Sequence, residues 1–120
     1  MKAYTDLKQS AQLAILLPTE SADMKYPYFG DGQYGTTALF GEPIEFSGSK
    51  DIPAWSLAAL FKLLPKCIEG AEPSLIKTFR DDYRIVYDIH GDENITSEDY
   101  TNPIDACYEM IIRLKEKELI

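Results

Sequence analysis

The chain has 120 residues, of which 45% are hydrophobic and 27% are charged, proportions typical of a globular protein. The length suits one domain with its own core, so we expect a single domain over residues 1–120. A formal charge of −8 disfavours direct binding to DNA or RNA, because a phosphate backbone is bound by clustered Lys and Arg. No apolar run approaches the roughly 20 residues that a membrane span requires.

The first predicted element is an amphipathic helix over about residues 3–17, which ends at Pro18. Four residues at helical spacing form its predicted apolar face: Tyr4, Leu7, Ala11 and Ala14. Polar residues interrupt this stretch and no small-residue cleavage site follows it, so we interpret it as a helix of the mature protein. We therefore expect the protein to be cytoplasmic.

Pro and Gly punctuate the next region, which favours short strands joined by turns, over about residues 26–29, 36–40 and 44–46. Gly30, Gly32 and Gly35 match the pattern G-x-G-x-x-G of dinucleotide-binding loops. That function requires a buried strand before the glycines and a helix opening after them. The flanking sequences are broken by Pro27, Gly41 and Pro43, so we interpret the glycines as turn residues and expect no cofactor.

The stretch over residues 51–66 predicts a second helix, near 54–64, that ends at Pro65. Pro53 suits an opening helical turn, and Ser56 is a second candidate for the start, as an N-cap. The helix has an apolar stripe that contains Leu57, Leu60, Phe61 and Leu64. Such a stripe is buried either in the core or in an interface between two copies of the chain. The sequence is therefore compatible with both a monomer and a homodimer.

An antiparallel hairpin is predicted from alternating residues over 75–80 and 84–89, with a turn at Asp81 and Asp82. The turn lacks Gly, which favours a longer or bulged turn over a tight one. The last element is a helix over about 103–118, capped by Asn102 and opened by Pro103. Its buried face is predicted to contain Ile104, Cys107, Ile111 and Leu114.

Together these elements predict an α+β fold, with an antiparallel sheet of three to five strands. The helices near 54–64 and 103–118 are expected on one face of that sheet, with the N-terminal helix completing the core. Cys67 and Cys107 can form one disulfide, but two reduced, buried thiols are the expected state. Their spacing predicts no zinc site.

Residues 81–105 contain eight acidic residues and one basic residue. This segment does not reproduce the register of a calcium-binding loop, so we interpret residues 92–99 as a solvated connection between strand and helix. A sharper hypothesis is that its carboxylates imitate nucleic-acid phosphates in a basic site of another protein. His90 is a candidate general base, with Asp88 or Asp92 as the group that orients it. With that role for His90, the protein would be a hydrolase or a module that binds a small molecule or a metal.

Tyrosines are favoured both in cores and in binding surfaces, so the aromatic residues of the Gly-rich region are candidates for recognition. The predicted interaction surface combines two of them with acidic residues of the later connection, namely Tyr28, Tyr34, Asp92, Glu93, Glu98 and Asp99.

The segments ESADMKY (20–26), DIPAWSLAALFKLLP (51–65) and NPIDACYEMIIRLKEKELI (102–120) resemble a group of small uncharacterised proteins of Bacteroidetes genomes, often encoded in prophages or mobile elements. The group has no assigned activity, so the resemblance implies no catalytic or binding residue. Residues 74–118 are also similar in outline to small antitoxin-like domains in which a hairpin precedes a helix. The sequence favours a non-enzymatic accessory protein that acts through an unidentified protein partner.

Overall fold

The structure is a computed structural model, which describes residues 2–43, 50–89 and 94–120. These residues form two compact units: an N-terminal unit, Ala3–Ala59, and a C-terminal unit, Leu60–Ile120 with Lys2. The boundary between them falls within helix α2 (Leu57–Leu63). The single domain expected over residues 1–120 stays a prediction.

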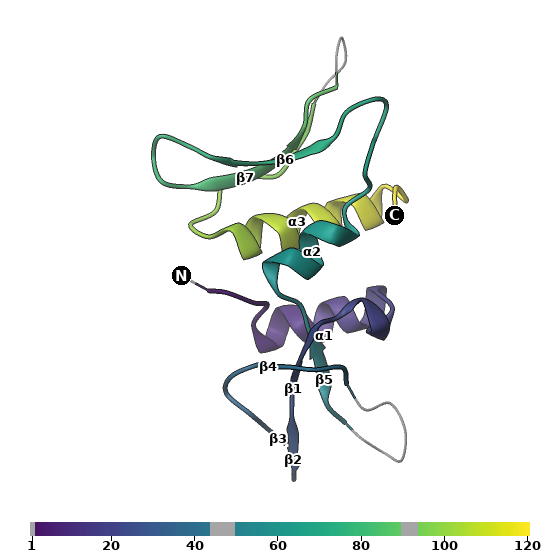
Figure 1. Cartoon of the computed structure of the whole chain (residues 1–120), viewed down its shortest axis with the longest axis vertical. Coiled ribbons are helices and arrows are strands. Elements are labelled where there is room, and N and C mark those ends of the chain that lie inside the picture. Colours follow the sequence, from purple (N-terminus) through teal and green to yellow (C-terminus); the bar gives the residue numbers. More distant parts are fainter. Residues whose placement is uncertain (1, 44–49, 90–93) are drawn as a thin grey trace. The chain divides into compact units, whose positions relative to one another are not determined.

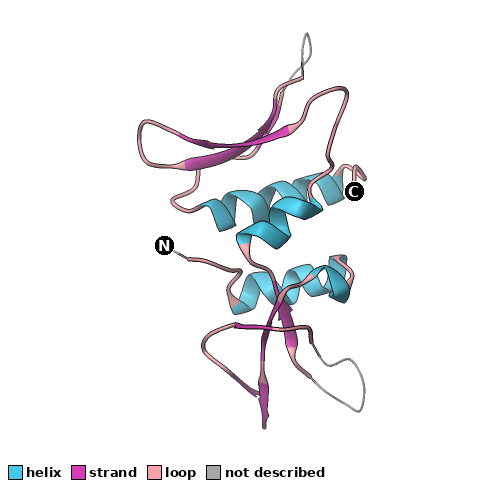
Figure 2. Cartoon of the chain, in the orientation of Figure 1, coloured by secondary structure: helices cyan, strands magenta, loops and turns pink. Residues whose placement is uncertain are grey.

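The predicted α+β class is confirmed, because the described residues form three α-helices and three antiparallel sheets of three, two and three strands (Figure 2). The strands are divided among small sheets instead of joining in one. Most have only two or three residues, because Pro and Gly end them early. The predicted strand over 44–46 lies outside the described residues, and the packing of all helices on one face stays a prediction.

The N-terminal unit contains a sheet in the order β4 (Leu39–Phe40), β1 (Met24–Tyr26), β5 (Ile52–Ala54). Helix α1 (Leu7–Leu16) contacts β5, as Figure 1 shows, and a 3-10 turn, η1 (Thr19–Ser21), leads from α1 towards β1. A separate hairpin consists of β2 (Tyr28–Gly30) and β3 (Gln33–Tyr34).

Helix α1 begins later than predicted. Asp6 is its N-cap, and its carboxylate accepts a hydrogen bond from the Gln9 N–H at 2.7 Å while the Gln9 side chain accepts one from the Asp6 N–H. Tyr4 therefore lies outside the helix, in a bridge to Ser56. The apolar face predicted from Tyr4, Leu7, Ala11 and Ala14 is wrong, because the buried positions are Ser10, Leu13 and the C-cap Leu17.

Pro53 does not open a helix. It lies in β5, where it pairs with Lys25 of β1. Strand β5 is at the edge of its sheet, where a residue without an N–H is tolerated. The alternative start is the correct one, because α2 begins after Ser56, whose hydroxyl accepts a hydrogen bond from the Ala59 N–H at 3.3 Å.

The C-terminal unit contains a sheet in the order β6 (Pro73–Lys77), β7 (Tyr83–Tyr87), β8 (Ile95–Thr96). Helix α3 (Pro103–Glu116) lies along this sheet and contacts β7 (Figure 1). The predicted hairpin and its longer turn are confirmed, with residues 78–82 between the strands. Phe79 belongs to that turn and not to the strand, and it is 94% exposed.

Helix α3 matches its prediction closely. The Asn102 side chain accepts a hydrogen bond from the Asp105 N–H at 2.9 Å, and Pro103 opens the helix. The predicted apolar face is buried in full, at Ile104, Cys107, Ile111 and Leu114. The predicted alternation on β7 is confirmed too, because Ile85 and Tyr87 are buried towards α3.

Candidate functional site

The Gly-rich motif forms the turn of the β2–β3 hairpin, as predicted. Gly30, Asp31 and Gly32 all have positive φ angles, of 98°, 50° and 75°. Gly tolerates this backbone, and Asp does so better than most residues. No helix opens directly after Gly35 in the described residues, because the next element is the strand Leu39–Phe40. The motif therefore builds a tight turn between two strands that carry aromatic residues.

Tyr28 and Tyr34, two residues of the predicted interaction surface, are partners across this hairpin. Their ring centroids are 5.1 Å apart, and the Lys50 ammonium lies 5.4 Å from the Tyr28 ring centroid. The Tyr28 hydroxyl accepts a hydrogen bond from the Gly32 N–H at 3.0 Å, and the Tyr28 N–H donates to Asp51 at 2.9 Å. These contacts hold both tyrosines in place, half-buried, on the hairpin.

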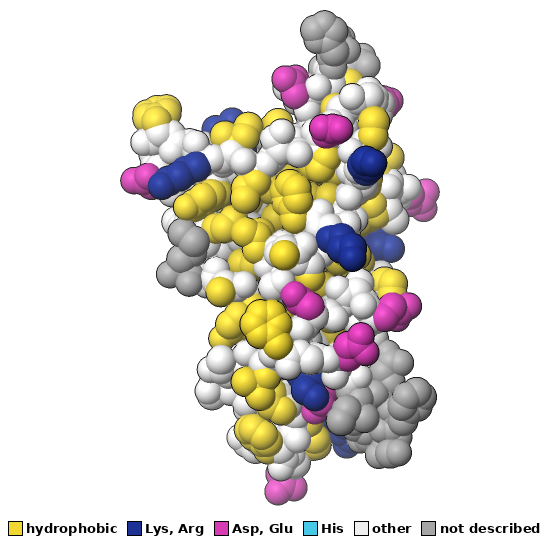
Figure 3. Space-filling view, viewed as in Figure 1, with side chains coloured by type: hydrophobic (Ala, Val, Ile, Leu, Met, Phe, Trp, Pro, Cys, Tyr) yellow, Lys and Arg dark blue, Asp and Glu magenta, His cyan; other side chains and the backbone are white. Residues whose placement is uncertain are grey.

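The same unit exposes large apolar side chains that the sequence did not distinguish from core residues. A register shift between Tyr28 and Gly30 leaves Phe29 without a partner on β3, and Phe29 is 72% exposed. Leu39 and Phe40 form the edge strand β4 and are 53% and 77% exposed. Hydrophobic side chains are visible at the surface in Figure 3. We name Phe29, Leu39 and Phe40 the apolar surface of the N-terminal unit.

The acidic members of the predicted surface belong to the C-terminal unit. Asp99 forms an ion pair with Arg84 at 2.9 Å, and Glu98 is exposed. Asp92 and Glu93 lie outside the described residues, as does His90 with its proposed general-base role. The predicted surface thus has its tyrosines in one unit and its described acids in the other.

Carboxylates of the acidic segment have partners within the chain. Asp81 lies 3.5 Å from Lys77, and Asp105 lies 2.7 Å from Lys2. Among the described residues, no group of three or more His, Cys, Asp or Glu side chains is arranged to hold a metal ion. The interpretation of residues 92–99 as a connection needs correction, because Ile95–Thr96 forms β8 and pairs with β7.

Both cysteines are free, as expected. Cys107 is fully buried on α3, and its burial raises the pKa of the thiol to about 12. A thiol with so high a pKa is a poor nucleophile at neutral pH. Cys67 is exposed, so the prediction that both thiols are buried is wrong for this one.

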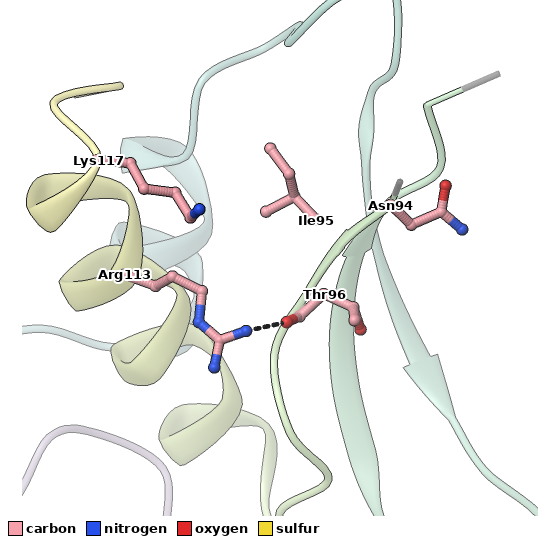
Figure 4. A pocket seen from close by; sticks show the side chains of 5 residues that line it. All are labelled: Asn94, Ile95, Thr96, Arg113 and Lys117. Carbon is pink, nitrogen blue, oxygen red and sulfur yellow. Dashed lines mark hydrogen bonds between the residues drawn. The ribbon is translucent and has the colours of Figure 1, made fainter. Parts of the chain in front are cut away.

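A pocket of about 280 Å³ lies between α3 and β8 in the C-terminal unit. Arg113 and Lys117 extend from α3 towards the strand, with Ile95 facing them (Figure 4). The Arg113 guanidinium donates a hydrogen bond of 2.5 Å to the Thr96 carbonyl and lies 3.6 Å from Glu109. Asn94 completes the lining and turns its side chain away from α3, where its amide oxygen accepts from the Ile89 N–H at 3.0 Å. We name this cavity the α3–β8 pocket.

Sequence reasoning missed this pocket. Cations are favoured in the last turn of any helix, so the presence of Arg113 near the end of α3 is explained without a strand beside it. The partner is a strand of two residues, too short to produce an alternating pattern. A second cavity, of about 400 Å³, has a mixed lining of apolar and charged residues, namely Phe61, Lys62, Leu64, Lys66, Glu72 and Pro73.

Within the described part of the chain, no helix combines the length and the apolar character needed to cross a membrane. No protein-family model matches the sequence, and neither the curated proteins nor the solved structures contain a significant match. Function is therefore inferred from the residues of this chain alone.

Proposed function

We propose that the protein is a non-enzymatic accessory protein that binds another protein through the apolar surface of its N-terminal unit. One observation carries the proposal: Phe29, Leu39 and Phe40 are each more than half exposed, within 12 residues of the chain. Contiguous exposed apolar patches mark contact sites, and we infer that these three side chains, which lie on β2 and on the edge strand β4, contribute to one contact surface. The partner is expected to present apolar side chains to these three residues.

The backbone supports the same proposal. Strand β4 is an edge strand of the β4–β1–β5 sheet and pairs with β1 alone among the described strands. An edge strand offers unpaired N–H and carbonyl groups to a segment of another chain. β4 has only two residues, which limits the edge that it offers, but Leu39 and Phe40 are both apolar and place no charge there that would repel another chain.

The test is recovery of the partner by the tagged protein from lysate of its native host. The double variant Phe29→Ser, Phe40→Ser is compared with Ile15→Ser as the matched control. Ile15 is 79% exposed on α1 of the same unit, so its replacement removes one exposed apolar side chain from another place, against two in the double variant.

We expect the control to retain the partner recovered by the unchanged protein and the double variant to lose most of it. Equal recovery by both variants would contradict the assignment of the surface. Specific turnover of a metabolite by the purified protein would contradict the non-enzymatic part of the proposal.

A further inference from the structure

The α3–β8 pocket concentrates positive charge in a protein whose formal charge is −8. Among the residues that the structure describes, the charged side chains that line it are Arg113 and Lys117, and none of the lining residues is acidic. Both cations extend from one helix towards the same strand (Figure 4). A small anion in this pocket can accept hydrogen bonds from two positively charged groups, the Arg113 guanidinium and the Lys117 ammonium.

Arg113 is held in position before any ligand arrives. Its guanidinium donates to the Thr96 carbonyl through Nη1, and its Nη2 lies 3.6 Å from Glu109. A guanidinium carries five N–H donors in a rigid plane, so these contacts leave donors available. A fixed Arg loses little conformational entropy when it binds an oxyanion, which favours recognition.

Lys117 supplies a second, adaptable donor. Its backbone N–H caps α3 by donating to the Arg113 carbonyl at 3.1 Å, while its side chain is exposed. Within the part of the chain that the structure describes, no ion pair joins a carboxylate to the Lys117 ammonium. The ammonium is therefore free to reach an anion held by Arg113.

The size and the remaining lining limit the class of ligand. A volume of about 280 Å³ lies near the lower end of the range of roughly 300–1,000 Å³ that is usual for small-molecule pockets. The Thr96 hydroxyl already donates to the Ser97 carbonyl at 3.1 Å, so it is not a further donor to a ligand. Ile95 faces the cations with an apolar side chain.

We propose that the α3–β8 pocket binds a small oxyanion, a phosphate or a carboxylate, between the Arg113 guanidinium and the Lys117 ammonium. If the ligand also carries a short apolar group, Ile95 would contact that group. This binding is separate from the contact with a protein partner, because the pocket and the apolar surface belong to different units. Either proposal can fail without the other.

The test is an NMR titration of the full-length, ¹⁵N-labelled protein with sodium phosphate and, separately, sodium butyrate. Sodium chloride at matched ionic strength measures the non-specific effect of salt. We expect saturable shifts of the amides of residues 94–97 and 113–117 with phosphate, butyrate or both. Saturation with phosphate alone assigns a phosphate ligand, and tighter binding of butyrate assigns a carboxylate with an apolar tail.

Lys117→Gln is the main variant, because the Lys117 side chain makes no described structural contact, and its matched control is Lys115→Gln on the same helix. Both remove one positive charge, but Lys115 does not line the pocket. Loss of a charge-assisted hydrogen bond is expected to weaken binding by about tenfold in Lys117→Gln and to leave it nearly unchanged in Lys115→Gln. Shifts that increase linearly without saturation, or equal weakening in both variants, would overturn the proposal.

Discussion

Thr5 is the centre of a buried polar network in the N-terminal unit. Its hydroxyl lies 2.7 Å from the Ser10 hydroxyl and accepts a hydrogen bond from the Trp55 N–H at 3.1 Å. Its N–H donates to the Trp55 carbonyl at 3.0 Å, and its carbonyl accepts from the Tyr26 hydroxyl at 2.8 Å. Thr5 and Ser10 are fully buried, so each polar group depends on these partners.

Replacing Thr5 by Val should therefore destabilise the protein although the shape of the side chain is kept. The Trp55 N–H would lose its acceptor, and the Ser10 hydroxyl would keep only its longer contact with the Thr5 carbonyl, at 3.4 Å, so we expect a cost of about 1–3 kcal/mol. Urea unfolding followed by the fluorescence of Trp55, the only Trp, measures the loss. Thr5→Ser keeps the hydroxyl and is expected to lose less; if both variants were equally stable, the network would not contribute as described.

Two buried tyrosines make stability sensitive to alkaline pH. Burial raises the pKa of Tyr87 to about 12, and burial, with smaller effects of Tyr4 and Asp6, raises that of Tyr26 to about 12. The folded protein holds these protons more tightly than the unfolded chain, in which the pKa is about 10. The contribution to stability is therefore complete below pH 10 and is lost as the pH rises from about 10 to about 12.

Tyr87→Phe tests this dependence. The hydroxyl donates to the Pro65 carbonyl at 2.6 Å, so its removal should cost about 1 kcal/mol at neutral pH. It also removes one titrating group, so the fall in stability between pH 10 and pH 12 should become smaller than in the unchanged protein. Urea midpoints measured at pH 8, 10 and 11 compare the two proteins, and the same fall in both would contradict the assignment.

Among the elements, α3 was the one best predicted from sequence. Asn102 and Pro103 are adjacent, and the apolar positions that follow keep a helical period over the whole element. The information is local, so no knowledge of distant partners is needed. The hairpin of β6 and β7 was predicted for the same reason, because its strands are neighbours in the sequence.

Elements whose start depends on distant residues were placed wrongly. Pro53 has the local context of a helix start, but its strand is defined by pairing with β1, almost 30 residues away. Asp23 accepts a hydrogen bond from the Ser56 N–H at 2.9 Å and so fixes where α2 begins. The conformation of residues 51–56 is thus set by tertiary contacts that no local pattern contains.

The pairing of β1 with β5 also gives a structural role to two of the segments on which the resemblance to small uncharacterised proteins was based. ESADMKY (20–26) and the start of DIPAWSLAALFKLLP (51–65) are neighbours in the N-terminal unit, where Met24 pairs with Ala54. The Trp55 indole N–H donates to the Ser21 hydroxyl at 3.0 Å. These residues hold the unit together, and the apolar surface lies elsewhere, at Phe29, Leu39 and Phe40.

The cap of α3 gives a prediction at the scale of the element. Asn102→Ala removes the acceptor for the Asp105 N–H and should lower the free energy of unfolding by about 0.5–2 kcal/mol. Asn102→Ser keeps an acceptor at the N-cap without placing a second carboxylate beside Asp105, whose Oδ2 accepts a hydrogen bond from the Asn102 amide at 2.8 Å, and it should recover part of the loss. Thermal unfolding followed by circular dichroism at 222 nm compares the variants, and equal melting temperatures for Ala and Asn would argue against a stabilising cap.

On the scale of the whole molecule, each compact unit has only about 60 residues. A domain of that size buries a smaller share of its surface than a larger domain does and is marginally stable alone. The boundary also falls inside a helix, so separate unfolding would interrupt α2. We therefore expect the chain to unfold as one domain, as its length predicts.

Urea unfolding monitored by two probes tests this expectation. Trp55 fluorescence reports on the N-terminal unit, and the amide signals of α3 in NMR spectra report on the C-terminal unit. Both probes should give one midpoint, and Thr5→Val should shift both together. Two separate midpoints, with Thr5→Val shifting only the fluorescence transition, would show that the units unfold independently.

The candidate site was the part of the molecule that the sequence predicted least. Tyr28 and Tyr34 were identified and do lie together, because a hairpin joins residues that are close in the chain. The exposure of Phe29 follows from a register shift, and that of Phe40 from its place on an edge strand. Neither feature leaves a pattern in the sequence, where an exposed Phe and a buried Phe look the same.

We propose that the protein acts by binding another protein through Phe29, Leu39 and Phe40. Hydrogen exchange, measured by mass spectrometry with and without the recovered partner, tests it most directly. We expect binding to slow hydrogen exchange in residues 28–40 and to leave exchange in residues 103–116 unchanged. Protection confined to other segments, with residues 28–40 exchanging as fast as in the free protein, would contradict it.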